Sequence, residues 1–521
     1  MTHIIRRQYL HVDLRGSEQE ALSLQIRLPE WCEQHLYPML DRVLDRLVPE
    51  HEYWSLENLE IDVERIELSR LDSDLPVLVE QALDKALRRQ WPKEPGEIAV
   101  ERISESQARH RTELASPIPS PAIQRHSRSE NLDAALAYFL KTGTLPWSFK
   151  PPQDSSLEQM LLDSWREQHP GECGTIQEAL QSEIARMRLM RQFSESFVID
   201  FLKWISPPVH QLVRSIQSKL EASDLPSDIR KILSKRILQS AVALAPSSVP
   251  NLENDLIEMV WRFLPRPIAE ATGLKTFVEK NWPGSFAAKN QLPQSKHGTR
   301  TAPTRQVSDN SIAQSDQSFQ DFYPVPETEN SPGGLAHHVD DTSVQAFRQH
   351  PEAAEGLYIE NAGLVLLHPF LPQLFQALDI ADYERILQAE RALCLLHFLA
   401  SGRTSAPEYE LILPKLLLNI PLLEPVDSAV HLKQNEIDEA EALLAAVIRH
   451  WEVLKNTGID GLRGSFLMRN GKITLREDGD WLLQVEGQAC DILLDQLPWG
   501  IGAIKLPWME PMLWVEWNTG S

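Results

Sequence analysis

The spacing of apolar residues changes several times along the first ninety positions. Apolar and polar residues alternate from 9 to 14 and again from 59 to 63, which is typical of half-buried strands. Residues 31–47 and 75–87 instead carry apolar side chains three or four positions apart, which predicts amphipathic helices. The pattern therefore predicts an α+β N-terminal domain over residues 1–90.

Helical spacing resumes near residue 131. Gly143 can end the first helix in a left-handed conformation, and Pro146 prevents that helix from continuing. The predicted helices, separated by Pro and Gly, cover residues 133–140, 157–168, 175–192, 195–205, 209–220, 227–245 and 252–263. We expect an irregular helical bundle over residues 128–289.

Two segments lack any such period. Residues 91–127 are rich in Ser, Pro and Arg, and residues 290–345 are dominated by Gln, Ser, Thr, Asp and Pro. Both have too few large apolar residues to offset the entropy lost on ordering. The sequence predicts a flexible linker at 91–127 and a disordered linker at 290–345.

The C-terminal part begins with helical spacing and ends with strand spacing. Apolar helical stretches cover residues 361–380, 383–400 and 409–418, and a further helix runs from Asn435, its predicted N-cap, to Gly458. The run SFLMRNGKITLRE predicts a hairpin turning at Asn470-Gly471, with further strands at 481–486 and 512–517. We expect a C-terminal α+β domain over residues 346–521. The fold class is thus mainly α with α+β terminal domains, multidomain, separated by disordered linkers.

Composition narrows the range of partners. The 36 prolines among 521 residues exclude one continuous helical rod. A net charge of −23 disfavours binding to nucleic acid or to anionic lipid, so neither a nucleic-acid partner nor stable membrane insertion is expected. No apolar run approaches the length of a membrane span, and no Sec signal peptide is recognisable. The four cysteines form no CxxC pair, which fits a reduced cytoplasm.

The residues of the chain predict a protein without enzymatic activity. The chain has no GxxxxGK[ST] loop, no HExxH pair and no GxSxG elbow. One local cluster could hold a metal, but it lies in a predicted linker that offers nothing to orient ligands: His337, His338, Asp340 and Asp341. We therefore expect no catalytic, cofactor-binding or metal site. A basic run is interpreted as a solvated helix edge rather than an anion site: Arg186, Arg188 and Arg191.

Four tryptophans near the C-terminus allow two interpretations, namely a surface that binds a partner or a packed core: Trp499, Trp508, Trp514 and Trp517. Trp514 and Trp517 are three apart on a predicted strand, so they face opposite sides and at least one packs into the core. Trp499 and Trp508 each follow a proline in a loop, which makes them the better surface candidates.

Several segments together resemble a known family. They are the opening HIIRRQYLHVDLRGSEQEALSLQ, the turn FLKTGTLPW, and the C-terminal runs ENAGLVLLHPFLPQLFQAL, ERALCLLHFLASG and ILPKLLLNIPLLEPV. These resemble the tape measure proteins of extracellular contractile injection systems, the phage-tail-like particles of the antifeeding-prophage and virulence-cassette type. Six residues occur here in the order that is typical of that family: Asn361, Gly363, His368, Pro369, Phe370 and Leu371. His368 and Phe370 therefore join the four tryptophans as the candidate interaction surface.

The resemblance implies a structural function without catalytic residues or cofactors. A tape measure sets tube and sheath length during assembly, and its implied partners are the inner tube, the baseplate or spike, and the terminator. It implies a cytoplasmic location during assembly, with the tube lumen as a further location. An alternative is an assembly chaperone or loading adaptor that binds particle components without being part of the mature particle.

Overall fold

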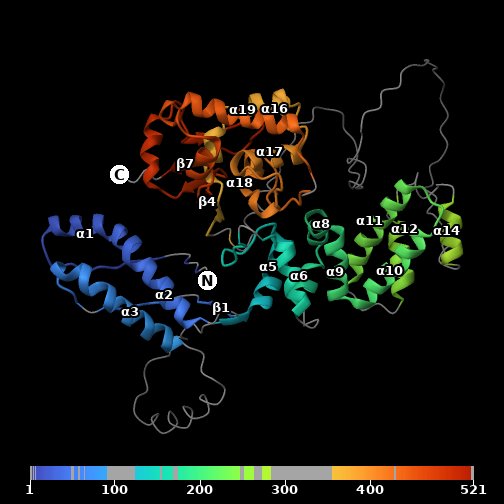
Figure 1. The fold of residues 1–521 in the computed structure, drawn as a ribbon, viewed down its shortest axis with the longest axis horizontal. Coiled ribbons are helices and arrows are strands. Elements are labelled where there is room, and N and C mark those ends of the chain that lie inside the picture. The colour runs from blue at the N-terminus through green and yellow to red at the C-terminus, as the bar shows by residue number, and fades with distance from the viewer. Residues whose placement is uncertain are drawn as a thin grey trace, which may run out of the picture. The chain divides into compact units, whose positions relative to one another are not determined.

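The computed structural model describes residues 8–48, 52–90, 124–167, 174–282 and 355–517, apart from short gaps within these ranges, and residues 3, 5 and 352 (Figure 1). The predicted linker 290–345 and residues 91–123 lie outside the described residues. The chain divides into two compact units: Met1–Leu136 with Pro146–His169, and Ala137–Leu145 with Pro170–Ser521.

Helices dominate the first unit. Helix α1 (Glu18–Trp31) continues through a π-helical turn, η1 (Cys32–Leu36), into α2 (Tyr37–Leu47). A 3-10 turn, η2 (Leu68–Arg70), leads into α3 (Leu71–Gln90), which packs on α2. Their shared core comprises Trp31, Cys32, Leu36, Met39, Val43, Val79, Leu83 and Leu87. The predicted helices of this region are confirmed.

The predicted strands of the N-terminal domain are wrong. Neither 9–14 nor 59–63 belongs to a sheet, although Leu59, Ile61 and Val63 do pack against the helical core. The observed sheet joins β1 (Glu52–Ser55) antiparallel to β2 (Gln124–Ser127), which falls in the predicted linker 91–127. Alternation shows which side chains face a core, but a strand also needs a neighbour to bond its backbone.

Helix α6 (Leu157–Glu167) is the last helix of the first unit, and α5 (Arg128–Thr142) begins there and ends in the second. Trp165 Nε1 donates a hydrogen bond to Asp133 Oδ1 over 3.2 Å. Burial raises the pKa of Asp133 to about 6, although the hydrogen bond from Trp165 opposes this shift.

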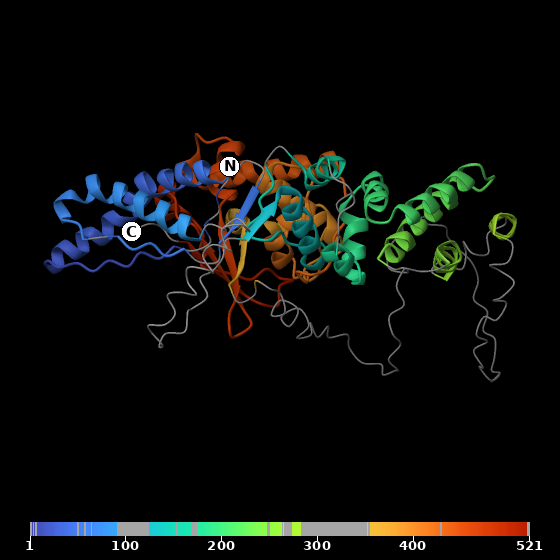
Figure 2. The ribbon, with the colours of Figure 1, turned by 90° about the horizontal axis from the view of Figure 1, so that it is seen from below.

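Between residues 174 and 282, the described part of the second unit contains these helices in chain order: α7 (Gly174–Ala179), α8 (Glu183–Gln192), α9 (Glu195–Ile205), α10 (Pro207–Glu221), α11 (Ser227–Leu244), α12 (Leu252–Arg262) and α14 (Leu274–Asn281). The green helices α10, α11 and α12 pack in sequence order (Figure 2). The bounds of α9 match the prediction. The stretch predicted as one helix over 175–192 is two, because residues 180–182 form a turn.

The C-terminal part contains a five-stranded sheet in the order β3 (Leu357–Ile359), β4 (Gly471–Leu475), β5 (Trp481–Val485), β7 (Leu513–Trp517) and β6 (Ala503–Ile504). Neighbours are antiparallel except β5 and β7, which are parallel. One register row places four buried side chains side by side on the core face: Leu357, Ile473, Leu483 and Val515.

The helices and helical turns of this part supply the rest of that core. They are η3 (Ala362–Leu367), α16 (Leu371–Ala377), α17 (Ala389–Ser401), η4 (Glu408–Glu410), α18 (Ile412–Leu417), α19 (Gln434–His450), η5 (Glu452–Leu454), α20 (Ile459–Leu462), η6 (Arg463–Leu467) and η7 (Ala489–Gln496). Nine consecutive residues of α17, from Ala392 to Ala400, are buried. This burial on all sides makes α17 a core helix.

Two local predictions in this part are wrong. Asn470-Gly471 is not the hairpin turn, because the chain before it is the π-helical turn η6 and Gly471 opens strand β4. The hairpin turns instead through Gly479, whose φ is +89°. Helix α19 is capped by Lys433 rather than by Asn435, and the Lys433 N–H donates to the Glu436 carboxylate over 2.6 Å.

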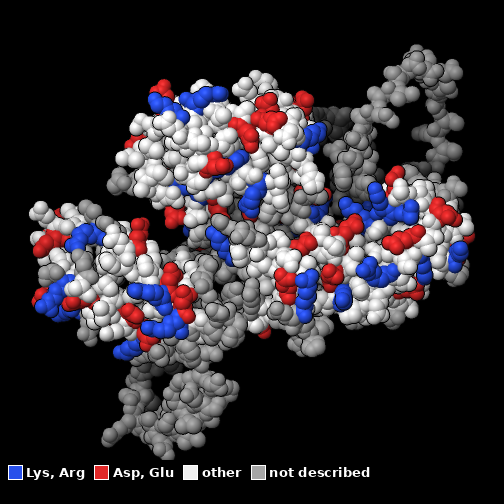
Figure 3. All heavy atoms as spheres, viewed as in Figure 1, with Lys and Arg blue, Asp and Glu red and all other residues white. Residues whose placement is uncertain are grey.

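The described part of the chain is thus mainly α with some β, and the predicted fold class is confirmed. Acidic and basic side chains lie among one another over much of the face that Figure 3 draws. Among the described helices, none combines the length and the apolarity needed to cross a bilayer.

Candidate functional site: a buried charge cluster

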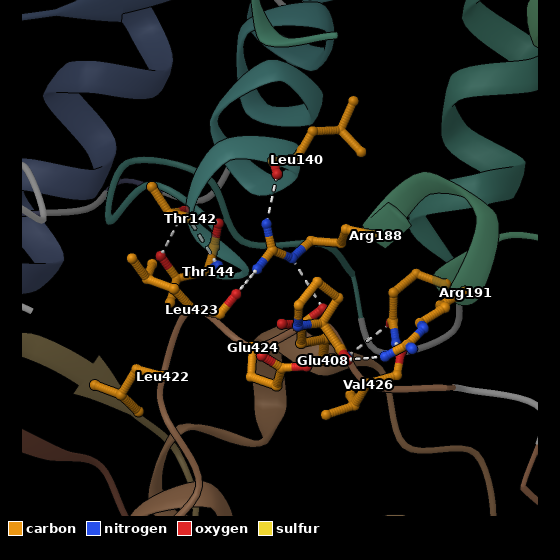
Figure 4. Close-up of polar contacts among 12 residues, drawn as sticks. Leu140, Thr142, Thr144, Arg188, Arg191, Glu408, Leu422, Leu423, Glu424 and Val426 are labelled. Carbon is orange, nitrogen blue, oxygen red and sulfur yellow. Dashed lines mark hydrogen bonds and ion pairs between the residues drawn. The ribbon is translucent and has the colours of Figure 1, made fainter. Parts of the chain in front are cut away.

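Three charged side chains from two distant segments meet inside the second unit, and Figure 4 shows two of them, Arg188 and Glu408. Arg188 on α8 is fully buried, and its Nε donates to Glu408 Oε2 over 2.9 Å. Lys415 on α18 donates from Nζ to the other oxygen of that carboxylate, Glu408 Oε1, over 2.7 Å. Because Glu408 and Lys415 are also buried, we call Arg188, Glu408 and Lys415 the buried charge cluster.

Main-chain carbonyls complete the coordination of both cations. The Arg188 guanidinium also donates to the carbonyls of Leu140, near the end of α5, and Leu423. Lys415 Nζ donates to the carbonyls of Leu422 and Glu424 over 3.0 and 2.7 Å. A planar guanidinium suits several acceptors at once, and the carbonyl end of a helix attracts a cation.

The cluster contains two cations and one carboxylate, so its charges do not cancel. Close hydrogen bonds therefore offset part of the cost of burying these charges. Burial lowers the pKa of Lys415, while the nearby Glu408 carboxylate acts to raise it. Removing one partner of a buried ion pair costs about 3–5 kcal/mol, because a charge is then left without compensation. Changes that break the cluster are therefore costly, and its bonds tie α8 and the end of α5 to residues 408–424.

A glycine in the turn after α5 makes room for the cluster. Gly143 has a φ of +78°, and its N–H bonds the Phe139 carbonyl over 2.8 Å. A Cβ at this position would lie 2.6 Å from Glu408 Oε1. The left-handed cap predicted at Gly143 is confirmed, and the turn also leaves space for the carboxylate.

Further contacts extend the cluster to the end of α8. Gln192 bonds both ways: its Nε2 donates to the Val426 carbonyl over 2.8 Å, and its Oε1 accepts from the Glu408 N–H over 2.9 Å. Arg191 Nη1 donates to the Pro425 carbonyl over 2.6 Å. These bonds connect the helical region to the C-terminal region over sequence separations above 200 residues.

Aromatic packing adjoins the same contacts. Phe139 meets the rings of Phe193 and Tyr409 edge to face, with centroids 6.1 and 5.9 Å apart. Burial raises the pKa of Tyr409 to about 12.

The interpretation of the basic run as a solvated edge is wrong. Arg188 is buried, and Arg186 Nη1 bonds the carbonyls of Leu180 and Gln181 over 2.6 and 2.9 Å. The run EIARMRLMRQ contains nothing that separates a buried arginine from an exposed one. A better signal is the lone Lys415 in ILPKLLLNIPLL, since a single cation within an apolar run needs a buried partner.

The four tryptophans lie in different environments. Trp508 is 7% exposed and donates from Nε1 to the Leu417 carbonyl, so it lies in the core. The burial of Trp508 is at odds with the surface role that its place in a loop favoured. Trp499 is half-buried and bonds the Leu366 carbonyl. Trp514 is 37% exposed, while Trp517 is half-buried and donates to Asp491.

Phe370 packs against the same core as Trp499, and His368 is half-buried. Phe370 packs edge to face on Trp499, with ring centroids 5.1 Å apart. Burial lowers the pKa of His368, whose Nδ1 lies 3.0 Å from the Val365 carbonyl oxygen. Of the six residues predicted to form an interaction surface, Trp514 is the one classed as a large exposed apolar side chain. The surface itself stays a prediction.

Two other residues of the family-like run have packing roles. The Asn361 side chain donates to the Glu410 carbonyl over 3.0 Å. A Cβ on Gly363 would lie 1.6 Å from the Phe466 carbonyl oxygen, so no larger residue fits there without moving the backbone. The fold therefore explains why position 361 holds an asparagine and position 363 a glycine.

The predicted-linker residues considered as a metal site lie outside the described residues: His337, His338, Asp340 and Asp341. Within the described ranges, no three His, Cys, Asp or Glu side chains gather closely enough to hold a metal ion.

Fold and site together define a mainly helical protein in which buried charges join distant segments. Nearly the whole chain also matches one family model, that of the contractile injection system tape measure proteins, over residues 2–517. The chain belongs to this family, and the resemblance noted in its sequence is confirmed. It has a structural role in the assembly of contractile injection systems, in association with components of the particle. No curated protein and no solved structure matches it.

Proposed function

We propose that this protein sets the tube length of a contractile injection particle without catalysing a reaction. Its two anchors are the N-terminal region, residues 1–90, and the C-terminal region, residues 346–521. Its partners are the inner tube, the baseplate or spike, and the terminator, and it acts in the cytoplasm and then in the tube lumen. The observation that carries the proposal is the family match over residues 2–517.

The buried charge cluster supports a particular way of setting length. It connects α8 to residues 408–424 within one compact unit, so the helices and the C-terminal sheet form a block of fixed size while the cluster is closed. The predicted linkers, residues 91–127 and 290–345, add length when the contacts that bridge their ends are released, namely the β1–β2 pairing and the buried charge cluster. Each linker residue contributes at most about 3.3–3.6 Å when fully extended.

Deletions in the second predicted linker test this function. Removing ten residues from 290–345 should shorten assembled particles by up to about 33–36 Å, as measured by electron microscopy. The matched control keeps the length of 290–345 but scrambles its order, and it should leave particle length unchanged. Normal particle length after graded deletions would contradict a length-setting role.

Mass spectrometry of particles separates this function from the alternative. A length-setting protein must be present in particles while the tube grows. If the chain is missing from particles purified at every stage of assembly, it acts instead as an assembly chaperone or loading adaptor.

A further inference from the structure

The segment before α1 has the pattern of a strand but no strand partner. Within the described part of the chain, no backbone hydrogen bond is formed by residues 9–15, and none of them belongs to a helix or sheet. Tyr9 is 83% exposed, Leu10 52% and Val12 48%. Unpaired backbone groups beside exposed apolar side chains can pair with another chain.

Contacts on both sides hold this segment in place. Before it, His3 Nε2 lies 2.9 Å from Asp45 Oδ1 on α2. After it, the Ser17 and Glu20 side chains form a capping box at the start of α1. Within it, His11 Nε2 and Asp13 Oδ1 are 3.7 Å apart, as expected when alternate residues of an extended chain face the same side.

We propose that residues 9–15 pair antiparallel with the same segment of a second copy of this chain, with Val12 opposite Val12. In this register, apolar residues face apolar residues, since Leu10 lies opposite Leu14. On the other face, His11 lies opposite Asp13, and Tyr9 lies opposite Arg15. Facing pairs of these kinds each contribute about 0.2–1 kcal/mol in antiparallel sheets.

The complementarity of this register follows from the order of residues in YLHVDLR. A two-fold axis through Val12 makes each segment both donor and acceptor of the same contacts, as an isologous dimer requires. A two-stranded ribbon is marginally stable in water, so we expect dimerisation to depend on protein concentration. The inference does not depend on the length-setting role.

Disulfide cross-linking of the full chain tests the pairing. Facing residues have Cβ atoms about 4.5–5.5 Å apart, close to the 3.5–4.5 Å that a disulfide needs. Val12→Cys should therefore give several times more covalent dimer on mild oxidation than Leu22→Cys, whose position on α1 is 56% exposed. The wild-type chain measures the background from native cysteines. Equal yields of covalent dimer from the two variants would overturn the proposal. No dimer from either variant would also overturn it, and this is the result expected if the segment pairs with another protein instead.

A mixed experiment tests the register. His11→Cys protein mixed with Asp13→Cys protein should give mostly the mixed disulfide, because positions 11 and 13 face each other. A predominance of the His11→Cys homodimer would indicate parallel pairing and overturn the proposed register. The changes lie on exposed positions, so circular dichroism should be unchanged in both variants.

Discussion

Replacing Glu408 with glutamine is the sharpest test of the buried charge cluster. The change keeps the size of the side chain but removes the one carboxylate that bonds both Arg188 and Lys415, at 2.9 and 2.7 Å. The glutamine amide can accept from one cation, but its NH2 group then faces the other. Two buried cations are left without an anion, for which we expect a loss of about 3–5 kcal/mol in the free energy of unfolding.

Urea denaturation followed by tryptophan fluorescence and circular dichroism measures this loss. The matched control is Glu477→Gln, because Glu477 lies exposed in the turn between β4 and β5 and its change should stay within about 0.5 kcal/mol. Arg188→Lys should be intermediate, since it keeps the charge but loses the forked contacts to two carbonyls. A loss below about 1 kcal/mol for Glu408→Gln would refute the reasoning.

Two further variants test local geometry and a shifted pKa. Gly143→Ala should lower the free energy of unfolding by about 1–2 kcal/mol through its positive φ, and by more through the clash with Glu408. Its cost should therefore clearly exceed that of Gly479→Ala, because Gly479 has a similar φ but open space around it. Equal costs of the two changes in urea denaturation would argue against the clash. For Asp133, the folded pKa of about 6 lies above the unfolded value of about 3.9, so its contribution to stability is present below about pH 4 and is lost as the pH rises through 6. Asp133→Asn should flatten that part of the pH profile, and an unchanged slope would contradict the assignment.

The sequence predicted helices better than strands for a physical reason. A helix closes its hydrogen bonds within itself, so apolar spacing predicted α9 at its observed bounds, Glu195–Ile205. A strand depends on a partner that local pattern does not reveal. Alternation at 59–63 marked side chains that pack on the core, but the strand pairing formed instead between β1 and β2.

The cluster could not be predicted for a related reason. Arg188 and Glu408 are 220 positions apart, and each looks like an ordinary surface charge in its own helix or turn. Two local signals did exist, namely Gly143 in its turn and Lys415 within an apolar run. Neither identifies the partner, because pairing across such a separation is decided by the tertiary fold.

The cluster also limits how a tape measure of this kind can extend. Pulling α8 away from residues 408–424 would separate Arg188 from the Glu408 carboxylate and from the Leu423 carbonyl, whereas Lys415 would stay with Glu408. Straightening a chain segment that has no packed core breaks no such contacts. Because the cluster joins α8 to residues 408–424, it bridges the two ends of the predicted linker 290–345, and tension reaches that linker only after the cluster opens. On this reasoning, residues 290–345 add to tube length only when assembly separates α8 from residues 408–424.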